Sequence, residues 1–293
     1  MVVGQVGCGH WGAHVLRDLR MLGCDVHVVA RSEASRARAR EGGAKTVVPD
    51  VGSLAGLDAV VVVTPIATHA DVLDDALQHD VPVFVEKPLC DDSADADRLA
   101  AVAPGRLFVM DKWRYHPAVL KLAELAESGS LGRPLGLRTI RVQPDNRHEE
   151  DATWVLAPHD LAIALEVLGE VPRPTTAAGV WDGERLVTLH AMLEAARGWH
   201  VTEISERAPR IERRVELHCD EGVAVLEGGW EEQVVVYTSA GGSERLETPG
   251  ELPLLAELRA FLGFVAGGDP PKSTVAEGAA AVHAIVEMRS LAR

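Results

Sequence analysis

Three glycines near the amino terminus have the spacing of a phosphate-binding turn. Gly7, Gly9 and Gly12 follow an apolar run as G-x-G-x-x-G, and an apolar stripe with helical spacing comes next. In a strand, turn and helix of this kind, the first glycine permits the tight turn, the second lets the backbone approach a pyrophosphate, and the third lets the helix pack on the strand. The sequence therefore predicts a dinucleotide site, which the neighbouring His10 and Trp11 also contact.

The second expected strand ends in Arg31 and Ser32, about twenty residues after the glycines. An acidic residue there would bind the ribose 2′-hydroxyl of NAD, whereas Arg and Ser suit the 2′-phosphate of NADP. Arg36 and two more arginines add positive charge on the helix that follows, with a solvated basic face as the alternative. We therefore expect NADP rather than NAD as the cofactor.

Two further turns end neighbouring strands of the same expected sheet. Thr64, Pro65 and His69 follow one strand, and Glu86 and Lys87 end the next. Open α/β sheets bind ligands at the carboxyl ends of their strands, so we expect all five residues to line the cofactor. Lys87, placed beside a nicotinamide, could also hold a substrate oxygen and stabilise its developing negative charge.

His159 lies at the start of a helix expected at 158–168, which is apolar nearly all round. Such a helix is buried, with its amino end toward the cleft. The positive helix end disfavours imidazolium, so a neutral His159 could accept a proton from a substrate alcohol. A cap or a structural role is the alternative. Asp160 and Tyr115 are candidate substrate contacts, and packing is an equally good interpretation of Tyr115.

The secondary structure expected to position these residues changes along the chain, from alternating strands and helices to an antiparallel sheet and then to helices. Short β-rich runs alternate with helical patterns from Met1 to about Asp111, which predicts a doubly wound parallel sheet. Residues 175–238 alternate as in an antiparallel sheet, and the last fifty residues return to helices. Strands are expected near 2–6, 25–30, 58–63, 82–85, 106–110 and 135–143, and a helix at 117–127.

We therefore predict an α/β fold with two domains. A Rossmann domain occupies 1–113, and an α/β domain with an open, largely antiparallel sheet occupies 114–293. The last helices could pack back on the Rossmann domain. At 293 residues the chain is long enough for two separate cores.

Composition excludes several classes of protein. The 47% hydrophobic and 25% charged content is that of a soluble globular chain, and no apolar run is long enough to cross a bilayer. Residue 1 already enters the first strand, so we expect a cytoplasmic protein with no membrane partner. The formal net charge of −15 argues against a nucleic-acid partner.

Metal and disulfide sites are not expected either. The four cysteines are scattered with no C-x-x-C pair, which argues against a zinc site or a disulfide framework. The run His148-Glu149-Glu150-Asp151 could be read as metal ligands, but polar runs between a strand and a helix are usually solvated loops. We therefore expect no metal.

In combination, the motifs resemble the glucose-fructose oxidoreductase and inositol dehydrogenase family, Gfo/Idh/MocA. The resemblance covers nearly the whole length and includes the glycine turn, Thr64-Pro65 with Thr68-His69, Glu86-Lys87-Pro88, Arg114-Tyr115-His116-Pro117, Leu131-Gly132-Arg133-Pro134, and Trp154-Val155-Leu156-Ala157-Pro158-His159-Asp160-Leu161. It implies a Rossmann domain followed by an α/β domain with an open sheet. It also implies nicotinamide-dependent chemistry on sugars, cyclitols and related small molecules, and a sheet that associates into a homodimer or larger homo-oligomer.

The resemblance also implies roles for single residues. Lys87 maps onto the family's catalytic lysine, and His159 onto the histidine of its D-x-x-x-H pair. The aspartate position is Val155 here. Valine cannot exchange a proton, so either His159 works without it or another carboxylate serves, such as Asp160 or one of those between 145 and 151.

The expected activity is NADP(H)-dependent hydride transfer to or from a secondary alcohol, carbonyl or imine carbon of a small sugar-like metabolite. One alternative is a non-catalytic NAD(P)-binding sensor or scaffold that kept the fold. Another is a lyase or glycosidase that uses the nicotinamide transiently.

Overall fold

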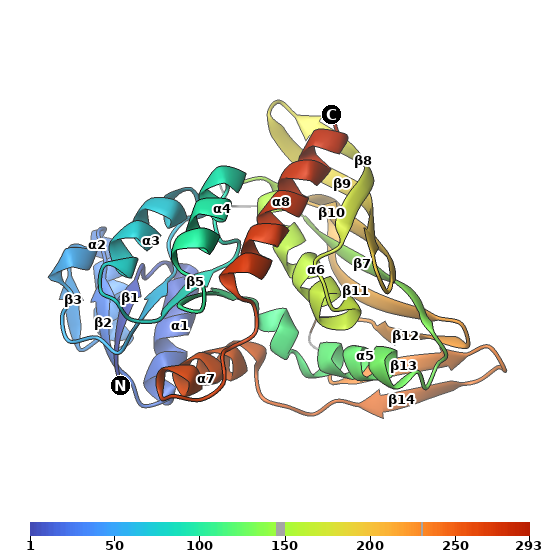
Figure 1. Ribbon diagram of the computed structural model, residues 1–293, viewed down its shortest axis with the longest axis horizontal. Coiled ribbons are helices and arrows are strands. Elements are labelled where there is room, and N and C mark those ends of the chain that lie inside the picture. The colour runs from blue at the N-terminus through green and yellow to red at the C-terminus, as the bar shows by residue number, and fades with distance from the viewer. Residues whose placement is uncertain (145–149, 230) are drawn as a thin grey trace. The chain divides into compact units, whose positions relative to one another are not determined.

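The computed structural model describes residues 1–144, 150–229 and 231–293 (Figure 1). The chain forms two compact units. The first comprises Met1–Lys112 and Leu254–Val282, and the second comprises Trp113–Pro253 and His283–Arg293.

The first unit is built on a parallel six-stranded sheet with the order β3-β2-β1-β4-β5-β6. Its strands are β1 (Val2–Val6), β2 (Asp25–Val29), β3 (Thr46–Val48), β4 (Ala59–Val62), β5 (Val83–Glu86) and β6 (Leu107–Met110). The prediction of a doubly wound parallel sheet is confirmed. The sequence analysis missed β3, because three residues are too few for a β pattern to show.

Helices cover this sheet, and its central strand β4 is buried from end to end. The helices are α1 (His10–Met21), α2 (Glu33–Glu41), α3 (His69–Leu77), α4 (Ser93–Val102) and α7 (Pro253–Val265), with short 3₁₀ turns at Val51–Ser53 and Ile66–Thr68. All four residues of β4 are buried, as expected for a parallel strand with both faces covered. The ring of Phe261 on α7 stacks on Phe84 of β5, with centroids 4.7 Å apart.

The second unit is built on an eight-stranded sheet with the order β14-β13-β12-β11-β7-β10-β9-β8. Its strands are β7 (Pro134–Pro144), β8 (Arg173–Asp182), β9 (Arg185–Ala195), β10 (Gly198–Ser205), β11 (Arg207–Cys219), β12 (Gly222–Leu226), β13 (Gln233–Thr238) and β14 (Ser243–Glu247). β10 pairs in parallel with β7, and the other neighbouring strands are antiparallel. The predicted open, largely antiparallel sheet is confirmed.

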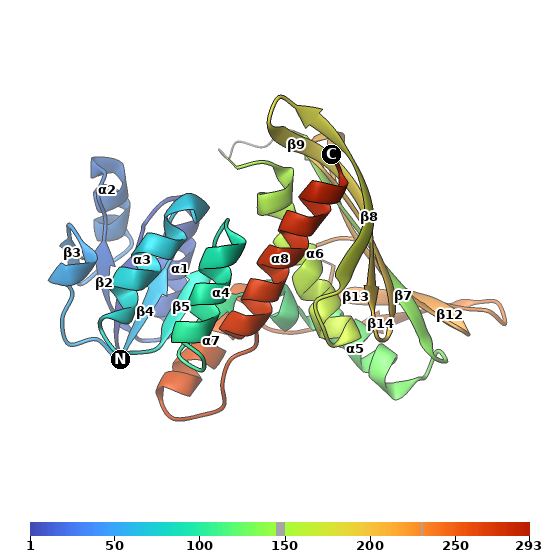
Figure 2. The same ribbon diagram turned by 45° about the horizontal axis from the view of Figure 1, so that its top comes forward.

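Two helices, α5 (Pro117–Ser128) and α6 (Ala152–Leu168), lie on one face of this sheet (Figure 2). α5 begins with proline and ends at Gly129 in the left-handed conformation, as the sequence predicts. Alternate strand residues such as Val215 and Leu217 pack under α5 and α6 in one apolar core. A long helix, α8 (Val275–Leu291), contributes its last residues to this unit and its first to the other.

Helix α6 starts six residues earlier than the sequence analysis expects. Asp151 caps it by accepting a hydrogen bond from the backbone N–H of Thr153, so Pro158 lies inside the helix instead of opening it. His159 is therefore in the helix interior. The expectation that a positive helix end keeps His159 neutral was wrong, because the dipole effect is confined to the first turn.

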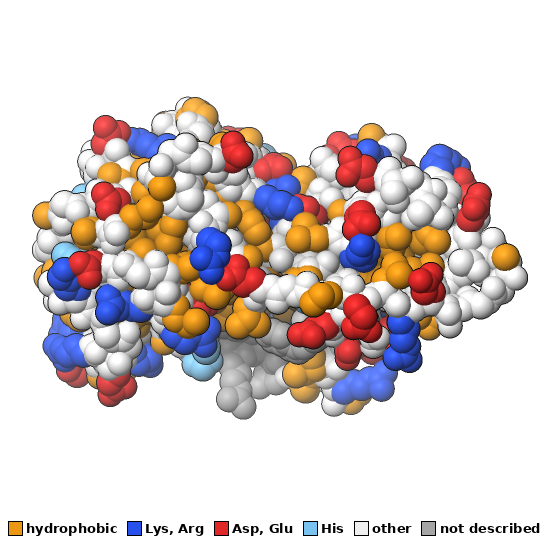
Figure 3. Space-filling model, turned by 90° about the horizontal axis from the view of Figure 1, so that it is seen from below, with side chains coloured by type: hydrophobic (Ala, Val, Ile, Leu, Met, Phe, Trp, Pro, Cys, Tyr) orange, Lys and Arg blue, Asp and Glu red, His pale blue; other side chains and the backbone are white. Residues whose placement is uncertain are grey.

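The surface of the described residues is mixed. Acidic, basic and apolar side chains are interspersed over the face that Figure 3 shows. Among the described residues, no helix combines the length and the apolar character that crossing a membrane requires.

Candidate active site

The glycine turn of the first unit is tight at two positions and open at the third. Gly7 has φ +97°, and a Cβ there would lie 2.3 Å from the carbonyl oxygen of Val63. A Cβ at Gly12 would lie 2.7 Å from the carbonyl oxygen of Gly7, whereas one at Gly9 would meet no described atom within 4 Å. Gln5 stabilises the turn, because its Nε2 donates to the carbonyl oxygens of Gly7 and Gly12, each at 2.8 Å. The turn thus leaves its open space at Gly9, where a pyrophosphate would approach.

The amino end of α1 carries no side-chain cap from the described residues. The helices α2, α4, α5 and α6 all have one, from Ser32, Asp92, His116 and Asp151. The first N–H groups of a helix have no intrahelical partner, and together with the helix dipole they favour a bound anion. These features fit the pyrophosphate of a nicotinamide cofactor.

His69 joins the two turns that follow β4 and β5. Its Nδ1 lies 2.9 Å from the carbonyl oxygen of Pro88, and its Nε2 lies 2.9 Å from that of Thr64. The side chain is fully buried, and burial lowers its pKa. His69 therefore acts on this edge of the sheet by holding the turns together. Pro65 is exposed, and Lys87 is half-buried at the carboxyl end of β5, where its bond to Pro88 is a cis peptide.

Three charged side chains, Glu86, Asp111 and Lys112, lie near Glu257. Glu257 of α7 is buried, and desolvation, then the charges of Glu86 and Asp111, raise its pKa well above the usual range. The ammonium group of Lys112 lies 4.3 Å from the centre of a Trp11 ring. The indole Nε1 of Trp11 is buried and has no hydrogen-bond partner among the described residues. Trp11 therefore offers a donor beside the glycine turn, whereas its neighbour His10 is exposed.

The end of β2 is positively charged. Arg31 is exposed, and Ser32 accepts a hydrogen bond from the backbone N–H of Ser35 as the cap of α2. Arg36 donates to the carbonyl oxygen of Ala30 at 3.1 Å. Arg38 reaches from α2 to the glycine turn, where its Nη1 donates to the carbonyl oxygen of Cys8 at 3.0 Å.

In the second unit, Val155 and His159 lie one turn apart on a half-exposed face of α6, whereas most of the helix is buried. Glu166, further along this face, pairs with Arg114 at 3.0 Å. The His159 ring meets the ring of Trp113 edge-on, with centroids 6.4 Å apart. Tyr115, in the 3₁₀ turn Lys112–Tyr115, is half-buried. The valine thus lies where the resembled pattern places its aspartate relative to the histidine.

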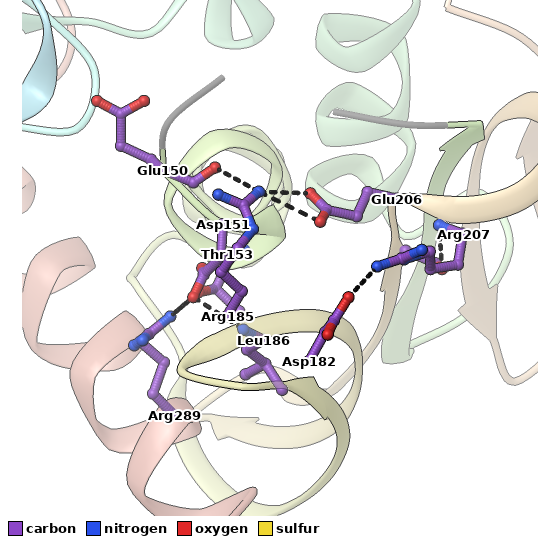
Figure 4. Close-up of polar contacts among 10 residues, drawn as sticks. Glu150, Asp151, Thr153, Asp182, Arg185, Leu186, Glu206, Arg207 and Arg289 are labelled. Atoms are coloured by element: carbon purple, nitrogen blue, oxygen red, sulfur yellow. Dashed lines mark hydrogen bonds and ion pairs between the residues drawn. The ribbon is translucent and has the colours of Figure 1, made fainter. Parts of the chain in front are cut away.

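A buried carboxylate fixes the start of α6 (Figure 4). Asp151 accepts hydrogen bonds from Thr153 Oγ1 at 2.6 Å, from the N–H of Leu186 at 3.0 Å and from the guanidinium of Arg289. Burial by itself would raise the pKa of Asp151, but these hydrogen bonds outweigh it and hold the pKa below its usual range. Asp151 ties α6 to β9 and α8, and so fixes the helix that carries His159.

Asp160 lies on the buried side of α6, away from the half-exposed face. Its Oδ1 accepts from Nε of Arg141 at 2.7 Å, and its Oδ2 accepts from Oγ1 of Thr202 at 3.3 Å. Burial raises the pKa of Asp160, and the charge of Arg141 opposes the rise. These bonds anchor α6 on β7 and β10.

Asp151 was considered from the sequence as a metal ligand or a substitute carboxylate, and not as a helix cap. Four further residues were not singled out from the sequence: Gln5, Glu257, Arg141 and Arg213. The burial of the two arginines could have been inferred from the sequence, since in its strand each lies at a two-residue spacing from apolar residues that face inward. The other two left no signal that a local pattern could detect. No group of three metal-ligating side chains occurs among the described residues, outside which His148 and Glu149 lie.

Comparisons with known proteins agree with this arrangement. A family model described as "Oxidoreductase family, NAD-binding Rossmann fold" (GFO_IDH_MocA) matches residues 1–107. Inositol 2-dehydrogenase 4 of Saccharopolyspora erythraea is 31% identical over 271 residues, which cover 82% of this chain and 78% of the relative. Inositol 2-dehydrogenase of Streptomyces avermitilis is 28% identical over 275 residues, or 82% and 76% of the two chains.

The solved structure of UDP-N-acetylglucosamine 3-dehydrogenase from Acidithiobacillus ferrooxidans is similar throughout. It is 25% identical in sequence and superposes with a TM-score of 0.86, covering 99% of this chain and 97% of that one. The glycine turn, the uncapped helix behind it and these relatives lead to one conclusion. The chain belongs to the Gfo/Idh/MocA family and is a nicotinamide-dependent oxidoreductase.

Proposed function

We propose that this enzyme uses NADP(H) to move a hydride to or from a secondary alcohol or carbonyl carbon of a small sugar-like metabolite. The observation that carries the proposal is the positive end of β2, where Arg31 follows the strand and Arg38 reaches the glycine turn. An acidic residue there would repel a 2′-phosphate, whereas a guanidinium binds phosphate through paired N–H groups. The sugar-like class is supported by the relatives, which are named for inositol and UDP-N-acetylglucosamine.

The roles follow from the chemistry of the side chains. The bound nicotinamide would accept or supply the hydride. Lys87 would donate a hydrogen bond to the reacting oxygen and stabilise its negative charge. His159 would take the proton of the substrate hydroxyl during oxidation and return it during reduction. With Val155 one turn before it, His159 works without the carboxylate of the family pattern.

Cofactor choice is tested by fluorescence titration with NADPH and NADH. Arg31→Asp should weaken NADPH binding by about 1.5–3 kcal/mol, or roughly ten- to a hundredfold, because a charge-assisted pair is lost. Arg40→Asp is the matched control: Arg40 pairs with Glu33 on the exposed side of α2, so the same change of charge should leave NADPH binding nearly unaltered. Equal affinity of the unmodified protein for NADH and NADPH would contradict the proposal.

Reaction type is tested by following reduced nicotinamide with a panel of cyclitols, sugars and nucleotide sugars. The proposal expects one nicotinamide oxidised or reduced for each product formed. A lyase or glycosidase would form product with no net change in nicotinamide. That result would refute hydride transfer as the net reaction.

We also propose that the sheet of the second unit forms a homo-oligomer through the face opposite α5 and α6. α5 and α6 cover one face of the sheet (Figure 2), and on the other face apolar side chains such as Val180 and Met192 are 58% and 40% exposed. Sedimentation should give at least twice the mass of the 31.4 kDa chain. A single-chain mass at working concentration would rule this out.

A further inference from the structure

Two arginines lie opposite each other on the helix-facing side of the second sheet. Arg141 of β7 and Arg213 of β11 are direct partners in the antiparallel register. Like charges at such a position repel each other and destabilise the sheet. Asp160 is the one carboxylate that pairs with either of them among the described residues, and it bonds Arg141. Two guanidinium groups therefore share a single negative charge.

The two arginines differ in burial and in the groups that they contact. The Arg141 side chain is only 4% exposed, held between Asp160 and the Trp113 ring, whose centre lies 4.6 Å from its guanidinium carbon. Arg213 is half-buried, and its bonds go to neutral groups: the carbonyl oxygens of Val142 and Glu212, at 2.7 and 2.9 Å, and Oε1 of Gln143 at 2.6 Å. These bonds fix its orientation, and the negative charge that acts on it among the described residues is that of Asp160, which is bonded to Arg141.

This excess charge lies close to the proposed proton acceptor. The Trp113 ring contacts both Arg141 and the ring of His159. Gly229 places its backbone against Trp113 and Arg213 together, since a Cβ there would lie 3.3 and 3.5 Å from their side chains. His159, Trp113, Arg141 and Arg213 thus form a continuous series of contacts. Burial and the neighbouring charge of Arg141 lower the pKa of Arg213 to about 10, and the charge of Asp160 opposes this shift only in part.

We propose that Arg213, supported by Arg141, binds an anionic group of the substrate, so that the preferred substrates are acidic sugar derivatives carrying a carboxylate or a phosphate. A guanidinium binds both groups through paired, charge-assisted hydrogen bonds. The bound anion would supply the negative charge that the pair of arginines lacks. This inference rests on the proposed function, since it assigns the substrate class of the same site.

The test is calorimetric titration of the cofactor-saturated protein with glucuronate, glucose 6-phosphate and glucose. At least one anion should bind about ten- to a hundredfold tighter than glucose, as expected for charge-assisted hydrogen bonds. The anion with the higher affinity identifies the group as carboxylate or phosphate. If neither anion binds more tightly than glucose, the inference is wrong, whether or not the protein turns over nicotinamide.

Single substitutions test whether Arg213 is the residue that binds the anion. Arg213→Gln should remove most of the preference for the anion and leave glucose binding unchanged, and Arg213→Lys should retain part of it. Arg214→Gln is the matched control, because Arg214 is next in sequence and pairs with Glu216 instead. An equal loss in Arg213→Gln and Arg214→Gln, or an equal loss for anion and glucose, would overturn the assignment. Because binding is measured without turnover, a failure here is distinct from a failure of hydride transfer.

Discussion

The candidate functional groups of the two units are of different kinds. The first offers backbone, in the open position at Gly9 and the uncapped end of α1, and its requirements fall within one short segment. The second offers side chains, and Arg141, Asp160 and Arg213 meet only because β7, α6 and β11 pack together. A local motif can therefore specify the glycine turn, whereas the group of Arg141, Asp160 and Arg213 depends on tertiary structure.

The largest expected effect is on turnover and comes from the lysine of the first unit. Lys87→Met should lower the turnover number by about 10²–10⁴-fold or more, because it removes a positive charge and a hydrogen-bond donor from the reacting oxygen. NADPH affinity, measured by fluorescence, should change far less. A turnover number within a few-fold of the unmodified enzyme would remove Lys87 from the chemistry.

The second unit should be sensitive to a single buried carboxylate. Asp151→Ala leaves the start of α6 uncapped and Arg289 without its ion pair, so the free energy of unfolding should fall by about 3–5 kcal/mol. Asp182→Ala is the control: its ion pair with Arg207 is exposed, and such pairs contribute about 0–1 kcal/mol (Figure 4). Urea denaturation measures both. Equal losses would mean that burial does not distinguish the two pairs.

Two glycine substitutions separate folding from cofactor binding. Gly7→Ala puts a side chain at φ +97° and against the Val63 carbonyl, so it should destabilise the protein without cofactor by about 1–3 kcal/mol. Gly9→Ala meets open space and should cost less than about 1 kcal/mol, yet weaken NADPH binding because the methyl group occupies the approach to the turn. Thermal melts and titrations test this pair. Unchanged NADPH affinity in Gly9→Ala would place the pyrophosphate elsewhere.

A further expected effect is on pH-dependent stability. Burial lowers the pKa of His200 to about 3, whereas an unfolded histidine titrates near about 6.5. Between these values the unfolded state binds the extra proton. The contribution of His200 is therefore complete above about pH 6.5 and is lost as the pH falls, by about 1.4 kcal/mol per pH unit. The free energy of unfolding, measured by urea denaturation at several pH values, should depend less steeply on pH in His200→Asn. The pH dependence should be unchanged in the exposed-site control His190→Asn.

What the sequence predicts depends on how local each feature is. The glycine turn and the long strands of both sheets follow from short patterns, and these were predicted. The start of α6 was misplaced because Pro158 resembles a first helical residue, and the cap that overrides it needs Leu186 and Arg289 from distant elements. The Arg141–Arg213 pairing was not predicted for the same reason, since only the strand register brings these side chains together.

The central claim is that the first unit binds the cofactor and that His159 of the second unit accepts the proton. Its most direct test is single-turnover hydride transfer by His159→Ala with a confirmed substrate and NADP(H). We expect cofactor affinity to stay within a few-fold of the unmodified enzyme, because the proposed cofactor contacts, the glycine turn and Arg31, belong to the first unit and are unchanged. We expect the hydride-transfer rate to fall by about 10²–10⁴-fold, because the second unit supplies the proton acceptor. A near-normal rate, or a loss of cofactor affinity equal to the loss of rate, would contradict the claim.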